Sequence, residues 1–233
     1  MSLLDSVLAR PDIWRGDRLA TACRPGVPTG YAALDAELPG GGWPAGALTE
    51  LLLDNEGIGE MQLLIPALAR LSRSGRPIAL IAPPYIPYAP ALAAGLDLAQ
   101  LIVVTCAAFR ETLWTAGQIL RSGACGAVLA WLSAVKYTEL RRLQLAAEEG
   151  RTVAALFRTT HAAAQASPAP LRLALAPAGG QLAIDIIKRH GPRLRAPLRI
   201  AVTRPVSDSN VLDSLPLPAP AAGNISTRSA IIR

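Results

Sequence analysis

The stretch LTELLLDNEGIGEMQLLIPALARL, residues 48–71, forms the centre of the expected fold. It starts with a continuous apolar run, passes through a polar turn that contains Gly57 and Gly59, and continues with apolar residues at helical spacing. A buried strand, a glycine turn and a helix in this order are the layout of a phosphate-binding P-loop. The stretch therefore predicts a strand over 47–53 and a helix over 60–74.

The residues that give a P-loop its chemistry are missing from this turn. A working loop has the pattern G-x-x-x-x-G-K-[ST], in which the lysine neutralises the phosphates and the hydroxyl holds Mg²⁺. If Gly59 is the second glycine, the first glycine position holds Asp54. The lysine and hydroxyl positions then hold Glu60 and Met61. The carboxylates of Asp54, Glu56 and Glu60 would repel a triphosphate, so we expect a degenerate loop without a bound cofactor.

Two further strands lack the carboxylates that ATP hydrolysis requires. The apolar strand at 126–132 ends at Trp131 and its neighbours, where a Walker-B carboxylate should stand. The strand at 77–82 leads into Pro83 and Pro84, where an acidic general base is expected. We therefore expect that the chain is not an enzyme and has no catalytic residues, and that its glycines serve backbone geometry alone.

Outward from this centre, apolar runs alternate with helical patterns. The expected strands are 47–53, 77–82, 101–106, 126–132 and 152–158, and the expected helices are 60–74, 89–96, 111–122 and 136–150. Such alternation indicates an α/β fold with a predominantly parallel sheet that is covered by helices on both faces. Residues 159–170 are expected to form a flexible loop. Alternating patterns at 171–177 and 181–191 predict a C-terminal antiparallel hairpin, with an edge strand at 198–202.

The 233 residues suit one ample domain flanked by two end segments. Residues 1–23 carry a short amphipathic helical pattern, residues 24–204 hold the domain with the degenerate loop, and residues 205–233 turn to Pro, Ser and Ala and are predicted to be disordered. No apolar run reaches the roughly 18 residues of a membrane span. The N-terminus lacks the pattern of a secretory signal, so a cytoplasmic location is expected.

Metal and thiol chemistry are not indicated by the sequence. The three cysteines, Cys23, Cys106 and Cys125, are odd in number and fit no metal-binding spacing, which favours reduced, buried thiols. His161 and His190 stand far from any cysteine or paired acid. We expect neither a metal site nor a catalytic triad.

The C-terminal third is strongly basic. The net charge is +6, and residues 151–233 hold 11 Lys and Arg against 3 Asp and Glu. Six of these cations lie within 17 residues without an acid: Lys188, Arg189, Arg193, Arg195, Arg199 and Arg204. Such a cluster can bind phosphate in a salt-sensitive way, dock an acidic partner, or form a solvated face, and all three interpretations stay open.

Three tryptophans have different expected roles. Trp43 and Trp131 are expected to anchor a loop or the core. Trp114 lies on the predicted helix at 111–122, and an exposed tryptophan there would mark a protein interface.

Several segments resemble a known superfamily. GVPTGYAALDAELPGGGWPAGALTEL, residues 26–51, is similar to the segment that precedes the P-loop in the RecA/RadA superfamily, with Pro-Thr-Gly at 28–30 and three glycines at 40–42. Followed by a degenerate loop, it looks most like the ImuA family of RecA-like accessory proteins. Residues 120–158 resemble both ImuA and the division inhibitor SulA, and residues 171–202 resemble the final hairpin of ImuA. The resemblance covers roughly residues 24–205 of the chain.

The resemblance implies a RecA-like pseudo-ATPase that belongs to the SOS response to DNA damage. Its implied role is non-catalytic and lies in translesion synthesis and mutagenesis, a branch of DNA repair. The implied partners are an ImuB-type Y-family-like protein and an error-prone DnaE-type polymerase, with RecA and a weak DNA contact as further candidates. Two alternatives stay open, a SulA-like inhibitor that binds FtsZ and an ATP-dependent RecA-type DNA-binding enzyme. The long segment 24–46 favours ImuA over SulA.

Overall fold

The computed structural model describes residues 25–85, 95–192, 194 and 196–202. The helical segment expected at 1–23, most of the helix expected at 89–96 and the tail 205–233 lie outside the described residues.

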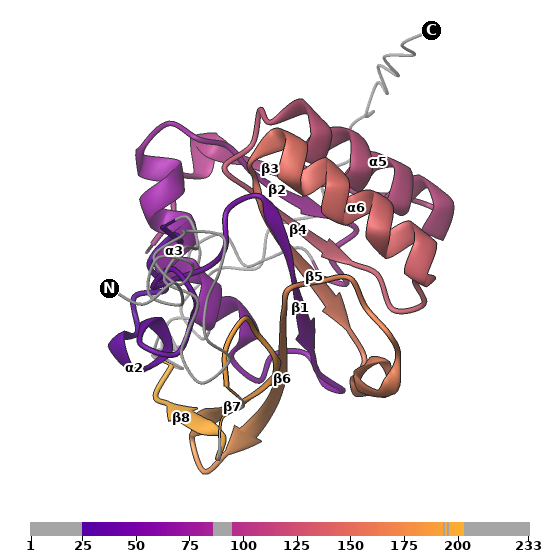
Figure 1. Ribbon diagram of the computed structural model, residues 1–233. Helices are drawn as coiled ribbons and strands as arrows, with labels where there is room; N and C mark the ends of the chain where they lie inside the picture. The colour runs from indigo at the N-terminus through magenta and orange to yellow at the C-terminus, as the bar shows by residue number, and fades with distance from the viewer. Residues whose placement is uncertain (1–24, 86–94, 193, 195, 203–233) are drawn as a thin grey trace, which may run out of the picture.

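One eight-stranded sheet forms the middle of the fold (Figure 1). Its strands are β1 (Ala47–Leu52), β2 (Ile78–Ile81), β3 (Leu101–Val104), β4 (Ala127–Trp131), β5 (Val153–Arg158), β6 (Leu171–Ala178), β7 (Gln181–Lys188) and β8 (Leu198–Ile200). Their order is β3-β2-β4-β5-β1-β6-β7-β8. Pairs from β3 to β6 are parallel, whereas β6 with β7 and β7 with β8 are antiparallel. The expected α/β fold, with its mostly parallel sheet and C-terminal hairpin, is confirmed.

Helices cover both faces of this sheet. They are α2 (Ala32–Asp35), α3 (Glu60–Arg73), α5 (Phe109–Ser122) and α6 (Tyr137–Gly150), with 3-10 helices η1 (Leu98–Gln100) and η2 (Thr160–Ala164). In Figure 1, α3 lies on one side of the sheet and α5 and α6 lie together on the other. Side chains alternate along a strand, so Leu51 joins the core beneath α3 while Leu48 joins the core beneath α5 and α6.

The segment before β1 folds back onto α3. Val27 and Trp43 form an isolated antiparallel bridge, and Trp43 is 1% exposed, which confirms it as an anchor. The Thr29 N–H donates to Asp35 Oδ1 at 2.8 Å, and the Tyr31 hydroxyl donates to the Gln62 carbonyl at 3.0 Å. These contacts connect the segment to the helix that follows the glycine loop.

Two features of the fold differ from expectation. Residues 160–164, expected within a loop, form η2, and Ala162 is buried. The edge strand β3 is poorly covered by described residues, since Ile102 and Val103 are 44% and 39% exposed. Among the described residues, cover on both faces therefore holds for the central strands and is incomplete at this edge. The sequence did not predict this difference, because an apolar run does not reveal which strand lies outermost.

Candidate functional site

The glycine loop lies between β1 and α3, at the carboxyl end of a strand inside the sheet. Gly57 and Gly59 have φ values of 77° and 119°, a region that L-residues rarely adopt. A Cβ at Gly59 would lie 2.6 Å from Cγ2 of Val202, which follows β8. The predicted geometric role of the glycines is confirmed, and the C-terminal end of the domain packs against the loop.

Glu60 holds the backbone donors of this loop. It is the first residue of α3 and is 6% exposed. Its Oε1 accepts from the Gly57 N–H at 2.8 Å, and its Oε2 accepts from the Gly59 N–H at 3.1 Å. Backbone N–H groups at a helix N-terminus are the donors that bind phosphate in a P-loop. Here they bind a carboxylate of the chain itself.

The other two carboxylates of the loop differ from Glu60 and from each other. Asp54 Oδ1 accepts from the Thr160 hydroxyl at 2.5 Å and from the Thr160 N–H at 3.2 Å. These hydrogen bonds lower the pKa of Asp54. Glu56 is exposed, and its carboxylate forms no hydrogen bond or ion pair with another described residue. Of the three carboxylates that were expected to repel a phosphate, those of Asp54 and Glu60 thus accept hydrogen bonds from neighbouring groups. The carboxylate of Glu56 alone lacks such a bond among the described residues.

Two small cavities adjoin the loop. One, of about 220 Å³, is lined by Met61, Pro83, Pro84 and Trp131 among others. The other, of about 230 Å³, lies between Trp131 and the ends of β1 and β5. Trp131 stacks on Phe157 with centroids 4.4 Å apart and an interplanar angle of 15°, in agreement with its expected anchoring role. Both volumes fall below the roughly 300 Å³ at which ligand pockets usually begin.

A buried ionic network centres on Glu50, in the middle of β1. Glu50 is 0% exposed. Its Oε2 accepts from Arg172 Nε at 2.6 Å, and its Oε1 accepts from Arg158 Nη1 at 3.0 Å. Glu50 pairs with Arg172 in register, and Arg158 pairs with Leu52, so all three charged side chains lie on one face. Sequence reasoning missed this network, and its one available signal was a glutamate inside an apolar run.

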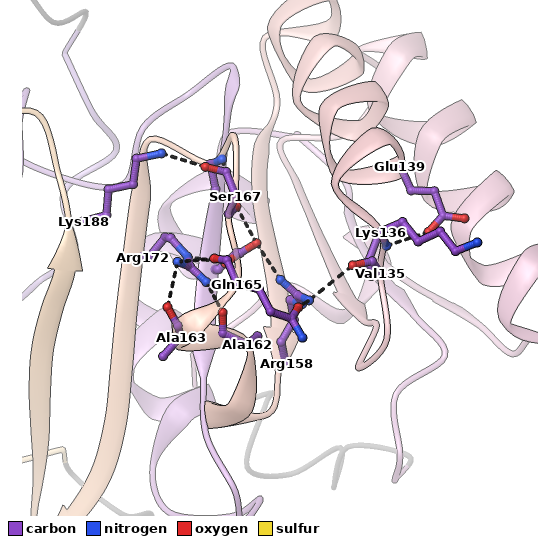
Figure 2. A network of polar contacts seen from close by, with 12 residues as sticks. Val135, Lys136, Glu139, Arg158, Ala162, Ala163, Gln165, Ser167, Arg172 and Lys188 are labelled. Atoms are coloured by element: carbon purple, nitrogen blue, oxygen red, sulfur yellow. Dashed lines mark hydrogen bonds and ion pairs between the residues drawn. The ribbon is translucent and has the colours of Figure 1, made fainter.

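Polar groups of the segment after β5 complete the network, as Figure 2 shows. Ser167 Oγ donates to Glu50 at 2.8 Å, and Arg158 Nη2 donates to Gln165 Oε1 at 2.9 Å. Arg172 Nη2 donates to the Ala162 carbonyl at 2.6 Å, which holds η2 against the sheet. A buried charge is tolerated when it is paired and hydrogen-bonded, so this network is structural in character.

The described members of the basic cluster do not form one patch. Lys188 Nζ donates to the Ser167 carbonyl at 2.8 Å, and Arg189 binds the Glu37 carboxylate at 2.5 Å. Arg199 is exposed and lies opposite Ala183 in the β7–β8 strand register. Ala183 is five residues from Lys188 along β7, which separates Arg199 from Lys188 by about 17 Å along the strand. The remaining three cations, Arg193, Arg195 and Arg204, lie outside the described residues. Binding by this cluster stays a prediction.

The described residues contain no group of three or more His, Cys, Asp or Glu side chains that could hold a metal ion. Within the same ranges, no helix has the length and apolar character needed to cross a membrane. Cys125 is buried, and this burial raises the pKa of its thiol. Cys106 is partly buried, and Cys23 lies outside the described residues.

No protein-family model matches the sequence, and no curated protein matches it. Among solved structures, the crystal structure of SulA from Pseudomonas aeruginosa is similar to part of the chain. It is 28% identical, and the match covers 50% of this chain and 99% of that chain with a TM-score of 0.42.

Proposed function

We propose that this chain is a non-catalytic, RecA-like accessory protein of damage-induced translesion DNA synthesis, where it connects an ImuB-type protein with an error-prone DnaE-type polymerase. The sequence resemblance over residues 24–205 supports this role, because it includes the segment before the loop, the loop and the hairpin. The mostly parallel sheet with a glycine loop after β1 supports the RecA-like part of the proposal.

The observation that carries the non-catalytic part is the position of the Glu60 carboxylate. Both of its oxygens accept from loop N–H groups that phosphate oxygens would need. A nucleotide would have to break these charge-assisted hydrogen bonds and then lie against the displaced carboxylate. Met61 offers no hydroxyl for Mg²⁺, and Trp131 stands where a carboxylate would be needed at the end of β4. Nucleotide binding and hydrolysis are therefore not part of the proposed role.

Nucleotide titration of the purified chain tests the non-catalytic part. We expect no saturable binding of a fluorescent ATP analogue in the presence of Mg²⁺, and no ATP hydrolysis. A matched variant, Glu60→Lys with Met61→Thr, places a lysine and a hydroxyl at the two substituted positions and reports on whether the rest of the loop can accept phosphate. Magnesium-dependent hydrolysis by the wild-type chain that disappears in Glu60→Ala would refute the non-catalytic part.

Co-purification from DNA-damaged cells tests the accessory role. The tagged full-length chain should recover an ImuB-type protein and a DnaE-type polymerase, and undamaged cells serve as the control. A second bait that lacks residues 205–233 shows whether the tail takes part. Recovery of FtsZ without polymerase components would refute the accessory role and assign the chain to the division inhibitors.

A further inference from the structure

A groove separates the outer surfaces of α5 and α6, which lie side by side in Figure 1. Its cavity measures about 340 Å³. Gly117 of α5 lines the groove, and a Cβ added there would make only ordinary van der Waals contact, at 3.8 Å from Leu143 Cδ2 of α6. Of the 14 residues of α5, only Thr112, Ala116 and Leu120 are buried. Most of α5 therefore faces outward, toward this groove and solvent.

Trp114 forms one wall of the groove and is 65% exposed. This exposure agrees with the interface role that the sequence suggested for it. The half-buried Leu113 continues the apolar surface into the groove. Leaving a tryptophan in water forfeits much of the free energy that its burial would provide, and exposed tryptophan is enriched at the centres of protein interfaces.

The charges around the groove are mostly positive. The described residues that line it include Arg110, Arg121 and Arg142, with one carboxylate among them, that of Glu139. Glu139 Oε2 already accepts from the Lys136 N–H at 2.8 Å, at the start of α6. Arg121 pairs with a glutamate outside the groove at 3.4 Å. The side chains of Arg110 and Arg142 form neither a hydrogen bond nor an ion pair with any other described residue.

We propose that the α5–α6 groove docks a short acidic segment of a partner protein. An apolar side chain of that segment packs on Trp114, and its carboxylates pair with Arg110 and Arg142. The cavity lies at the lower end of the roughly 300–1,000 Å³ range of ligand pockets, which suits one or two anchoring side chains. The assignment rests on the proposed accessory role for its biological meaning, because an adaptor needs such a docking surface.

A protein segment fits the groove better than single-stranded nucleic acid does. Nucleic-acid channels combine a continuous basic track with several aromatic side chains for base stacking. Among the described residues, the lining of this groove holds one aromatic side chain, Trp114, and a carboxylate, Glu139. The chain's own ends are also poor occupants, because residues 1–24 hold four Arg against three Asp and residues 203–233 hold three Arg against two Asp.

Fluorescence anisotropy with a designed peptide tests the groove. The probe is a labelled helical peptide of about 15 residues with glutamates flanking a leucine and phenylalanine stripe, and a lysine version is its charge-reversed control. We expect the acidic peptide to bind the full chain at about 0.1 M salt, where charges more than roughly 10 Å apart are largely screened, and the lysine peptide not to bind. Arg142→Glu should weaken binding about tenfold, and Trp114→Ala about 30-fold.

Arg141→Glu is the matched control for Arg142→Glu. Arg141 is the neighbouring exposed arginine of α6, and it lines a different cavity, near Pro44. The Arg141→Glu substitution should leave the affinity for the acidic peptide within about twofold of wild type, since the charge at position 141 lies outside the groove. Circular dichroism of each variant checks that the fold persists.

Three results would overturn the proposal. The first is that the acidic peptide does not bind, and the second is that Arg141→Glu and Arg142→Glu weaken its binding equally. The third is that Arg142→Glu abolishes binding of a labelled single-stranded oligonucleotide and leaves binding of the acidic peptide unchanged. The experiment also separates the groove from the accessory role. Intact peptide binding without recovery of polymerase components would refute the role alone, and the reverse result would refute the groove alone.

Discussion

Replacing Glu50 by glutamine should destabilise the fold by about 3–5 kcal/mol, the range for removing one partner of a buried ion pair. The guanidinium groups that Glu50 joins belong to Arg158 and Arg172, whose side chains are 1% and 6% exposed. Glutamine keeps the size of the side chain and removes its charge. One of its two terminal atoms also becomes a donor that faces an arginine donor. Both buried cations then lose their counter-ion.

The expected loss is large against the roughly 5–15 kcal/mol by which whole domains are stable. For a chain of this length each kcal/mol lowers Tm by about 2–4 °C, so a fall of about 6–20 °C is expected. Urea unfolding followed by circular dichroism measures the free energy directly. The matched control is Glu149→Gln, which breaks the exposed pair with Arg121 at 3.4 Å and should cost less than about 1 kcal/mol.

A Glu50→Gln variant that loses less than about 1 kcal/mol would refute the reasoning, because it would mean that water or another group already compensates the two arginines. Equal losses in Glu50→Gln and Glu149→Gln would also refute it. That outcome would show that burial of the network adds nothing to the worth of its charges.

Three further predictions concern the glycine loop. Gly59→Ala should lower the free energy of unfolding by about 1–3 kcal/mol in urea, because the φ of 119° suits glycine and Val202 occupies the Cβ position. In Gly57→Ala the new Cβ meets no atom within 4 Å, so this variant should lose only about 1 kcal/mol. Equal costs would contradict the packing at Gly59. Glu60→Ala should lower stability by about 1–3 kcal/mol, since two loop N–H groups lose their acceptor and that of Gly59 is buried, and an unchanged Tm would show that the carboxylate does not hold them. The hydrogen bonds that lower the Asp54 pKa below 3.8 stabilise the fold above that pH. The stability difference between wild type and Asp54→Asn should therefore shrink as the pH falls through the lowered pKa. A stability difference that stays constant from about pH 6 to about pH 2.5 would contradict this prediction.

Most of the sheet and the helices followed from local patterns in the sequence. Continuous apolar runs predicted strands such as β4 and β5, and helical spacing ending at a glycine predicted α5 and α6. The prediction failed for η2, where the local sequence carries no helical periodicity. Arg172, a residue of the next strand, holds that segment by donating hydrogen bonds to the carbonyls of Ala162 and Ala163, and such contacts leave no local pattern.

By itself, the sequence determined that the glycine loop lacks the lysine and hydroxyl of a P-loop, because side-chain chemistry at fixed spacing needs no coordinates. The tertiary structure decided where the Glu60 carboxylate lies, since the positive φ of the neighbouring glycines turns two N–H groups toward it. It also decided the partners of Glu50, which are 108 and 122 residues away in the chain. Strand order brings such distant residues together, and that order results from packing of the whole sheet.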